Sequence, residues 1–420
     1  MQPMLSKEER AKILAAPRPR RLPLLAPPAP SRPELARETR DVDRACRPIY
    51  AVWEITLACD LACRHCGSRA GKARPDELST AEAIDLVAQM AALGIREVTL
   101  IGGEVYLYPG WEAVVRTIRA ERMQCTMVTG GRGMNAERAR AAAEAGVQSV
   151  AVSLDGEAES HDRLRGHDGS HAAALAALDA CRASGMQVAV NTQVNRLNLA
   201  ELPLVFERLV AAGAHGWQIQ LTVPAGRAAD EPDVILQPFD LAQLFPLLAE
   251  LKARADAAGI KLLAGNNVGY FGPHEADLRS HQPGAYADSC SAGRSTLGIE
   301  ANGDIKGCPS LPTADWVGGN VREHRLEAIW HRAKALRHTR DRDASERWGY
   351  CAECYYGDVC RGGCTWMATS LFGRPGNNPY CHHRVLELAK KGVRERVVQE
   401  AAAPGAPFDH ALWKLVEEPL

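Results

Sequence analysis

Ten of the thirteen cysteines in this chain fall into two arrays whose spacing suits metal ligation. The first array is a C-x3-C-x2-C triplet formed by Cys59, Cys63 and Cys66. The second array lies far downstream and comprises Cys290, Cys308, Cys351, Cys354, Cys360, Cys364 and Cys381. Thiolates this close together in a sequence bind zinc or iron–sulfur clusters. The cysteine pattern therefore predicts metal chemistry at two places along the chain.

The first triplet supplies too few ligands for a closed metal site. A cubane [4Fe–4S] cluster normally takes four thiolates, so three would leave one iron open to a ligand from outside the protein. A zinc ion would need a fourth Cys or His. His65 and His161 are the candidates, but His65 directly precedes Cys66, which gives poor ligand geometry. The triplet therefore favours a cluster over zinc.

The composition is that of an ordinary globular protein, with 46% hydrophobic and 24% charged residues. A formal net charge of -1 predicts no nucleic-acid partner and no membrane partner. No apolar run approaches the roughly 18–20 residues that cross a bilayer, and no export signal is recognisable. An odd number of cysteines excludes complete disulfide pairing, so we expect a reducing, cytoplasmic location. Cys125 and Cys181, outside both arrays, are expected to be buried hydrophobic residues.

Alternating strand-like and helical segments would position the first array. Strands are expected at residues 49–56, 97–101, 125–129, 149–154, 187–194 and 217–223. Amphipathic helices are expected between them, including 79–93, 136–145, 171–184 and 199–211. Ser79 and Glu82 form a capping box that starts the first of these helices. The succession implies an α/β fold with a parallel sheet, either two wound halves or an incomplete barrel, with catalytic loops at the carboxyl ends of the strands.

Composition also divides the chain. The expected parts are a Pro/Arg-rich arm (1–48), the strand–helix region (49–237), a helical bridge and linker (238–289), a cysteine-rich region (290–383) and a closing helix with a tail (384–420). Within the arm we expect a short helix at 6–15 and polyproline-like chain at 17–33. The closing helix is expected to reach residue 401. The cysteine-rich region lacks long periodic runs, so we expect metal to be structural there.

Further residues near the first array match a known pattern. Gly102-Gly103-Glu104 follows the second expected strand, and Ser153-Leu154-Asp155-Gly156 follows the fourth, with Arg165 beyond it. Together with C-x3-C-x2-C after the first strand, these residues resemble the radical S-adenosylmethionine (SAM) superfamily. The resemblance implies a partial (β/α)6 TIM-like barrel. It also implies that Gly102, Gly103 and Glu104 hold the methionine amino group, and that Ser153, Asp155 and Arg165 contact the SAM ribose and carboxylate. Val105 departs mildly from the pattern, since Pro is common there.

The same resemblance implies the cofactors. Cys59, Cys63 and Cys66 would hold a [4Fe–4S] cluster whose open iron binds SAM. One-electron transfer would then split SAM into methionine and a 5′-deoxyadenosyl radical, which the barrel must position and shield. Arg132, Arg165 and Arg227 are candidates for cationic contacts at the open face of the barrel; a solvated surface position is the alternative for Arg132.

The second array resembles the SPASM domain, with all seven of its cysteines present. That resemblance implies two auxiliary iron–sulfur clusters, expected to be [4Fe–4S]. Cys351, Cys354, Cys360 and Cys381 would ligate the outer cluster, and Cys290, Cys308 and Cys364 would hold the inner one. The inner cluster would keep an open iron, or take Asp288 or a substrate atom as its fourth ligand. Considered alone, the C-x2-C pair also suits structural zinc.

Radical SAM enzymes with SPASM domains act mostly on peptides and proteins. The resemblance thus implies an enzyme that abstracts hydrogen from a precursor peptide and installs an oxidative modification such as a crosslink. Pro309 follows Cys308 where sulfatase-activating relatives have Asp, which disfavours that activity. The arm is too short and Pro-rich for a winged peptide-recognition domain, so a separate protein, or the barrel and arm themselves, would read the leader. A flavodoxin or ferredoxin is the expected electron donor.

Two other functions stay open at this point. One is a small-molecule dehydrogenase or mutase built on the same core. The other is a non-catalytic iron–sulfur or zinc-binding scaffold that has lost turnover. Formation of 5′-deoxyadenosine separates the scaffold from both enzymes, whereas the identity of the substrate separates the two enzymes from each other.

Overall fold

A computed structural model describes residues 5–16, 34–287 and 290–420. The expected polyproline-like chain at 17–33 and the candidate ligand Asp288 lie outside the described residues. Of the described helices near the N-terminus, α1 (Lys7–Ala15) confirms the short helix predicted at 6–15. The second, α2 (Asp41–Ala45), packs with the cysteine-rich region, where Asp43 lies 2.7 Å from Arg337.

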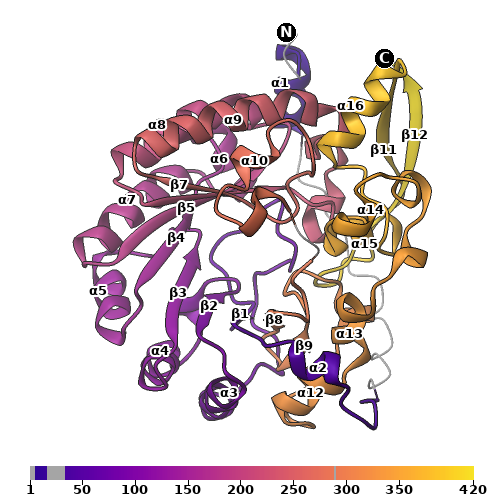
Figure 1. Ribbon diagram of the computed structural model, residues 1–420. Helices are drawn as coiled ribbons and strands as arrows, with labels where there is room; N and C mark the ends of the chain where they lie inside the picture. Colours follow the sequence, from indigo (N-terminus) through magenta and orange to yellow (C-terminus); the bar gives the residue numbers. More distant parts are fainter. Residues whose placement is uncertain (1–4, 17–33, 288–289) are drawn as a thin grey trace.

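Six parallel strands form the predicted barrel sheet. They are β1 (Tyr50–Glu54), β2 (Glu97–Ile101), β3 (Gln124–Thr129), β4 (Ser149–Ser153), β5 (Gln187–Val194) and β6 (Gly216–Leu221). Each pairs in parallel with the next along the chain. The helices that connect them are α3 (Thr80–Leu93), α4 (Trp111–Ala120), α5 (Ala136–Ala145), α6 (Ala158–Arg165), α7 (Ser170–Ala183) and α8 (Leu202–Ala211). Figure 1 shows α3, α4, α5, α7 and α8 along the outer face of the sheet, so the predicted α/β partial barrel is confirmed.

The alternation of side chains along each strand separates core from lumen. On β5, Val188, Val190, Thr192 and Val194 are buried, whereas Ala189, Asn191 and Gln193, which alternate with them, are partly exposed. Successive strand residues point to opposite faces, so one face of β5 belongs to the hydrophobic core and the other lines the barrel interior. The capping box predicted for α3 is also present, with Glu82 N–H donating to Ser79 Oγ and Ser79 N–H donating to Glu82.

The sheet continues on both sides of the predicted barrel. Beyond β6 lies β7 (Lys261–Ala264), and β8 (Thr296–Ile299) pairs in parallel with β1. Two short antiparallel strands, β9 (Asp304–Lys306) and β10 (Gly319–Asn320), complete the ten described strands of this sheet. Strands from the expected bridge and the cysteine-rich region therefore flank the barrel strands. The division of the chain into five parts stays a prediction.

One long helix packs behind the far edge of the sheet. It is α9 (Leu241–Ala257), within the helical stretch predicted after residue 237. Contrary to the expectation that no apolar run approaches membrane-spanning length, the described stretch Pro232–Ala257 is long and apolar enough by length and composition, yet 56% of its apolar window is buried inside the structure. Apolar residues such as Leu244, Leu248 and Leu251 face the core, which accounts for its hydropathy.

The C-terminal prediction was wrong. The closing helix α16 (His382–Lys390) ends eleven residues before the expected 401, and two antiparallel strands follow, β11 (Val393–Ala401) and β12 (Leu412–Pro419). Gly392 has φ +76°, a left-handed conformation that stops the helix. The β-branched residues Val393, Val397 and Val398 then favour an extended chain.

Short helices fill the cysteine-rich region beside the barrel (Figure 1). The described ones are α11 (Thr313–Trp316), α12 (Leu326–Arg332), α13 (Lys334–Asp341), α14 (Gly357–Cys360) and α15 (Thr365–Phe372), and α10 (Glu275–Leu278) precedes them in the linker. Leu326, Ile329 and Trp330 of α12 belong to the same hydrophobic core as the barrel. The cysteine-rich region thus shares the hydrophobic core of the barrel.

Candidate active site

The three cysteines of the first array line one cavity of about 160 Å³, which we call the cluster-loop cavity. They lie on the loop that follows β1. Five of the predicted SAM contacts line the same cavity: Gly102, Gly103, Glu104, Ser153 and Arg165. All thirteen cysteines are described, and each is free of disulfide bonding. The structure therefore gathers the ends of β1, β2 and β4, together with α6, around one space.

Two glycines let the loop after β2 lie directly on the cysteine loop. A Cβ atom at Gly102, where φ is +149°, would lie 2.4 Å from the carbonyl oxygen of Thr56. At Gly103 it would lie 2.0 Å from the carbonyl oxygen of Ala58. Instead, Gly103 N–H donates to the Thr56 carbonyl at 2.7 Å. Only glycine permits this backbone contact, which fixes the position of the next residue, Glu104.

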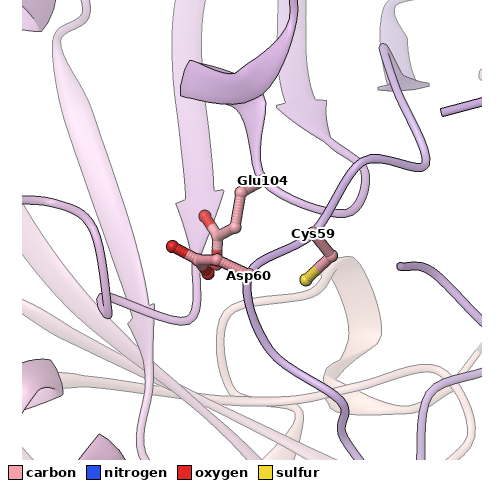
Figure 2. Close-up of side chains that lie close together, drawn as sticks. All are labelled: Cys59, Asp60 and Glu104. Atoms are coloured by element: carbon pink, nitrogen blue, oxygen red, sulfur yellow. The ribbon is translucent and has the colours of Figure 1, made fainter. Parts of the chain in front are cut away.

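Glu104 is buried and oriented by its neighbours. Its carboxylate accepts hydrogen bonds from Thr129 Oγ1 at 2.6 Å and from Gly130 N–H at 2.7 Å. Burial raises the pKa of Glu104 to about 7, although these hydrogen bonds act in the opposite direction. Figure 2 shows the carboxyl groups of Glu104 and Asp60 close together, with Cys59 beside them. One ligand atom from each of the three lies within 4.8 Å of the others, an arrangement that suits a cation such as an ammonium group.

Asp155 lies behind the cavity wall instead of in it. Its buried carboxylate contacts Arg165 Nη2 at 2.5 Å and His65 Nε2 at 3.0 Å. Burial raises the pKa of Asp155, but the charges of Arg165 and His65 outweigh that effect and hold the pKa below its ordinary value. Asp155 N–H also donates to Nδ1 of His161. Both histidines considered as zinc ligands therefore contact Asp155, His65 at its carboxylate and His161 at its backbone N–H, and a direct Asp155–SAM contact stays a prediction.

Two arginines bring positive charge to the cysteine triplet. Arg165 Nη1 lies 3.7 Å from Cys63 Sγ, and Arg227 lines the same cavity. Burial raises the pKa of Cys59 to about 12. Burial also raises the pKa of Cys66, but Arg227 and hydrogen bonds from neighbouring groups outweigh it, so that pKa falls below its ordinary value. Arg132 is instead exposed and donates to the Asp60 carbonyl.

The donor set fits a cluster that carries negative charge and has an open iron. Three thiols face one cavity without a fourth cysteine among its described lining residues. The guanidinium groups of Arg165 and Arg227 compensate part of the charge that three buried thiolates would carry. Acceptors at Glu104 lie where a ligand amine could bind. These residues would hold a [4Fe–4S] cluster and SAM.

The sequence analysis missed a contact from the C-terminus to the cysteine loop. The segment between β11 and β12 reaches this loop, where Phe408 N–H donates to the Gly67 carbonyl at 3.1 Å. Asp409 accepts from Arg69 Nε at 2.8 Å, and Arg69 also contacts Asp230 at 2.7 Å. Arg69 has φ +52°, a conformation held by these partners. Because residues 402–411 had been assigned to a tail, nothing in their sequence pointed to this role.

The second array separates into two sets of cysteines. Four of them, Cys351, Cys354, Cys360 and Cys381, line a cavity of only about 20 Å³, the outer thiol cavity. The other three, Cys290, Cys308 and Cys364, line a cavity of about 580 Å³, the central cavity. Burial raises the pKa of Cys381 to about 12 and that of Cys308 to about 11. Buried thiols of this kind become thiolates when a metal supplies compensating charge. The ligation of particular clusters stays a prediction.

The central cavity connects the cluster-loop cavity with the inner set of three cysteines. It shares six lining residues with the cluster-loop cavity: Ile101, Gly102, Val128, Ser153, Arg165 and Gln193. The first cysteine triplet and the inner set of three therefore open on adjoining spaces in the barrel interior. A substrate in the central cavity would lie between them.

Comparison with known proteins agrees with this arrangement. Residues 53–203 match the radical SAM superfamily, and residues 290–355 match the SPASM iron–sulfur cluster-binding domain. The mycofactocin maturase MftC of Mycobacterium ulcerans is 33% identical over 375 residues, covering 87% of this chain and 94% of that protein. The AdoMet-dependent heme synthase of Methanosarcina barkeri is 30% identical, covering 80% of this chain and 97% of that protein.

A solved structure shares the fold. Streptococcus suis SuiB bound to its precursor peptide SuiA superposes with a TM-score of 0.60 at 15% identity. The match covers 82% of this chain and 76% of SuiB. At this identity the likeness concerns the fold, a barrel followed by a cysteine-rich domain.

Proposed function

The chain belongs to the radical SAM superfamily and carries a SPASM domain, and we propose that it installs an oxidative modification, such as a crosslink, in a ribosomally synthesised peptide. One observation carries the proposal. A cavity of about 580 Å³ is lined by three cysteines of the SPASM domain and adjoins the cavity that the C-x3-C-x2-C triplet of the barrel lines. Net oxidation of a substrate needs a radical source on one side and an electron acceptor within reach, and this cavity adjoins residues suited to both.

The residues of the cluster-loop cavity have separate tasks in this proposal. Cys59, Cys63 and Cys66 hold a [4Fe–4S] cluster, and Glu104 accepts hydrogen bonds from the amino group of SAM. When bound, the reduced cluster and SAM supply a 5′-deoxyadenosyl radical that abstracts hydrogen from an unactivated C–H bond. Arg165, held by Asp155, balances the charge of the cysteine loop and closes one wall. Gly102 and Gly103 hold the loop of Glu104 against the cysteine loop, and Ser153 contacts the bound SAM.

The SPASM cysteines complete the proposal. Cys290, Cys308 and Cys364 would hold an inner auxiliary cluster, and Cys351, Cys354, Cys360 and Cys381 an outer one, both of the [4Fe–4S] type. Four thiols around a cavity of about 20 Å³ support complete ligation of the outer cluster. The three thiols on the central cavity support an inner cluster with an open iron.

Partners and location follow from the same chemistry. The substrate is a precursor peptide, its leader is read by a separate protein or by the barrel and arm, and a flavodoxin or ferredoxin supplies electrons. A cytoplasmic location keeps thirteen free cysteines reduced. The peptide-modifying relatives, and the SuiB structure with its bound precursor peptide, support the choice of substrate class.

The heme synthase relatives raise a second candidate, a porphyrin substrate. Heme and related porphyrins carry carboxylates, which a binding site would pair with arginine or lysine. Among the described residues lining the central cavity, Arg165 is the single charged side chain, and it is already paired with Asp155. The lining therefore favours a substrate without carboxylates in this space.

The test is anaerobic reconstitution with iron and sulfide, followed by dithionite and SAM. We expect 5′-deoxyadenosine, and a loss of two or more hydrogens from a short peptide encoded beside the gene. Absence of 5′-deoxyadenosine from fully iron-loaded protein would refute the enzymatic proposal. Its formation with turnover of a porphyrin, and no change in the peptide, would transfer the assignment to the second candidate.

A further inference from the structure

The wall of the central cavity carries a patch of carboxamide side chains. Asn191 and Gln193 lie on β5, and Gln218 and Gln220 lie on β6. In the parallel register Asn191 pairs with Gln218 and Gln193 pairs with Gln220. All four line the central cavity, and we call them the amide patch. They form two adjacent rows on the lumen face of the sheet.

The amide patch differs from the other polar groups around the lumen. Thr99 exchanges hydrogen bonds with Tyr50 and Thr126, at 2.8 and 2.7 Å, so these hydroxyls satisfy one another. Thr192 donates to the Leu154 carbonyl. By contrast, none of the four carboxamides forms a side-chain hydrogen bond with another described residue. Their hydrogen-bonding capacity is directed at the cavity.

Such groups need partners inside a binding site. A carboxamide offers two N–H donors and one carbonyl acceptor. Leaving such a group without a partner when water is displaced is costly, so the occupant of the cavity must supply matching donors and acceptors. A carboxylate-rich ligand offers acceptors alone, and an apolar ligand offers neither. A peptide main chain offers both in alternation.

The spacing of the patch also matches a peptide. Two residues along a strand span about 6.6 Å, and neighbouring strands lie about 4.8 Å apart. The N–H and C=O groups on one edge of an extended peptide repeat at the same two-residue interval. The spacing of two carboxamides along one strand therefore matches the spacing of the main-chain groups of an extended segment lying along the strands. This holds for Asn191 and Gln193 on one strand and for Gln218 and Gln220 on the other.

We propose that Asn191, Gln218 and Gln220, with Gln193 at the boundary of the cluster-loop cavity, bind the main chain of an extended, uncharged peptide segment in the central cavity. This inference rests on the proposed function and specifies how the substrate is held. Main-chain recognition positions a residue beside the radical source without requiring a particular side chain. Specificity for one side chain then falls to the rest of the lining, which includes Trp366 and Leu311.

The test measures binding by iron-loaded enzyme in the presence of SAM, under anaerobic equilibrium dialysis. The probe is a mixture of N-acetylated, C-amidated hexapeptides with neutral side chains, compared with the same mixture methylated at every main-chain nitrogen. Coproporphyrin, a tetracarboxylate, serves as the competing chemistry. Gln218→Met and Gln220→Met remove the carboxamide at nearly constant volume, and Asn191→Leu does so from the neighbouring strand. Gln187→Met is the matched control, because Gln187 lies on β5 in the same alternation but is exposed and outside the central cavity.

We expect wild-type enzyme to retain the unmethylated peptides at least about 10-fold better than the methylated ones. Each patch substitution should weaken retention by about 3- to 10-fold and reduce that preference, whereas Gln187→Met should change it less than about 2-fold. Equal retention of both mixtures by wild type, no retention of peptide, stronger retention of coproporphyrin, or unchanged binding in all three variants would each overturn the inference.

A separate measurement distinguishes failure of the proposed function. Wild-type enzyme that forms 5′-deoxyadenosine but shows any of those binding results refutes the amide patch alone. Wild-type enzyme with full iron that forms no 5′-deoxyadenosine refutes the proposed function, whatever the dialysis shows. If one substitution prevents folding, the variant on the other strand gives the same comparison.

Discussion

The two groups of three cysteines and the group of four differ in the space beside them. The triplet on the barrel loop and the inner SPASM set line the larger cavities, of about 160 and 580 Å³. The outer set of four surrounds a cavity of about 20 Å³. The two sets of three thiols thus adjoin larger cavities, and the set of four leaves little free space between its thiols. This contrast agrees with the proposal of open irons at the first two sites and complete ligation at the third.

The surroundings of the sets differ in a second respect. The barrel triplet is flanked by Arg165 and Arg227 and by the acceptor Glu104, so its loop is fixed by charge and by hydrogen bonds. The outer set is packed among rings, with Phe271 stacked on Tyr356 at 4.4 Å between centroids. A metal in such packing contributes folding energy directly. A metal on the barrel loop is attached to a scaffold that the sheet already holds.

The largest effect is expected from Cys63→Ala. With one of three thiols removed, the barrel loop cannot retain a cluster, so 5′-deoxyadenosine formation should fall to the level of a reaction without enzyme. Iron content should fall by about four atoms per chain, because one cubane is lost. Cys181→Ala, a buried cysteine on α7, is the control and should retain iron. Substantial SAM cleavage by Cys63→Ala would contradict the assignment.

Cys360→Ala and Cys364→Ala compare the outer set of cysteines with the inner set. Cys360→Ala removes a thiol from the outer set and should lower the Tm by about 5 °C or more, because metal there supports folding. Cys364→Ala should lower the Tm less but abolish product formation. Thermal unfolding and peptide mass spectrometry measure the two effects. Equal Tm values for both variants would contradict the expectation that metal supports folding more in the outer set than in the inner set.

Glu104→Gln tests the acceptor in the cluster-loop cavity. Hydrogen bonds to a charged group are worth about 1.5–3 kcal/mol, so we expect SAM binding to weaken by about 10- to 100-fold with iron content unchanged. Equilibrium dialysis with labelled SAM gives the affinity. Asp60→Asn is the variant for comparison. Asp60 lies beside Glu104 (Figure 2), but it is not among the described residues that line this cavity. A wild-type affinity in Glu104→Gln would remove its proposed role.

Glu300→Gln tests the link between the two regions. Glu300 contacts Arg74 of the barrel loop at 2.8 Å and Lys306 of β9 at 2.6 Å. Burial raises the pKa of Glu300, but Lys306 and Arg74 outweigh it and lower the pKa to about 2. Because the folded-state pKa lies below the ordinary value of 4.5, this stabilisation is present above pH 4.5 and is lost as the pH falls toward 2.

The free energy of unfolding of the variant at pH 7 should therefore be about 3 kcal/mol lower than that of wild type. That difference should shrink between pH 4.5 and pH 2. Urea unfolding across this range provides the measurement, with Glu144→Gln on an exposed face of α5 as the control. A difference that does not depend on pH would show that the charge of Glu300 is not what stabilises the fold.

The smallest effect is expected from Asp409→Asn. The amide can still accept hydrogen bonds from Gly405 and Ala406, but it loses the ionic contact with Arg69. Since Arg69 keeps Asp230, the cost to folding should be about 1 kcal/mol. The looser cysteine loop should release iron to a chelator several-fold faster than wild type does. Glu417→Gln on β12 is the control, and equal release rates would separate the C-terminal segment from the cysteine loop.

Much of the candidate site could be predicted because its chemistry is local in sequence. C-x3-C-x2-C and Gly102-Gly103-Glu104 each lie within a few residues of a strand end, and parallel strands bring their carboxyl ends together. The same logic failed at the C-terminus. Nothing in residues 393–420 indicated that a hairpin would return to Gly67, because that contact depends on chain segments more than 300 residues apart. The position of Asp155 at a strand end likewise did not show that its carboxylate contacts Arg165 and His65, and its contact with SAM stays a prediction.

The sequence alone was sufficient to predict the parallel strand–helix succession and the family, and to recognise the two cysteine arrays. These properties depend on residue identity and short-range spacing, which can be read from the sequence without a structure. Three features became clear only from the folded structure. They are the cavities that the cysteines share with particular strands, the extension of the barrel sheet by β7 and β8, and the carboxamides that face the space between the cysteine sets. Those relations arise when distant segments pack, because burial and charge compensation act between residues that the order of the chain keeps apart.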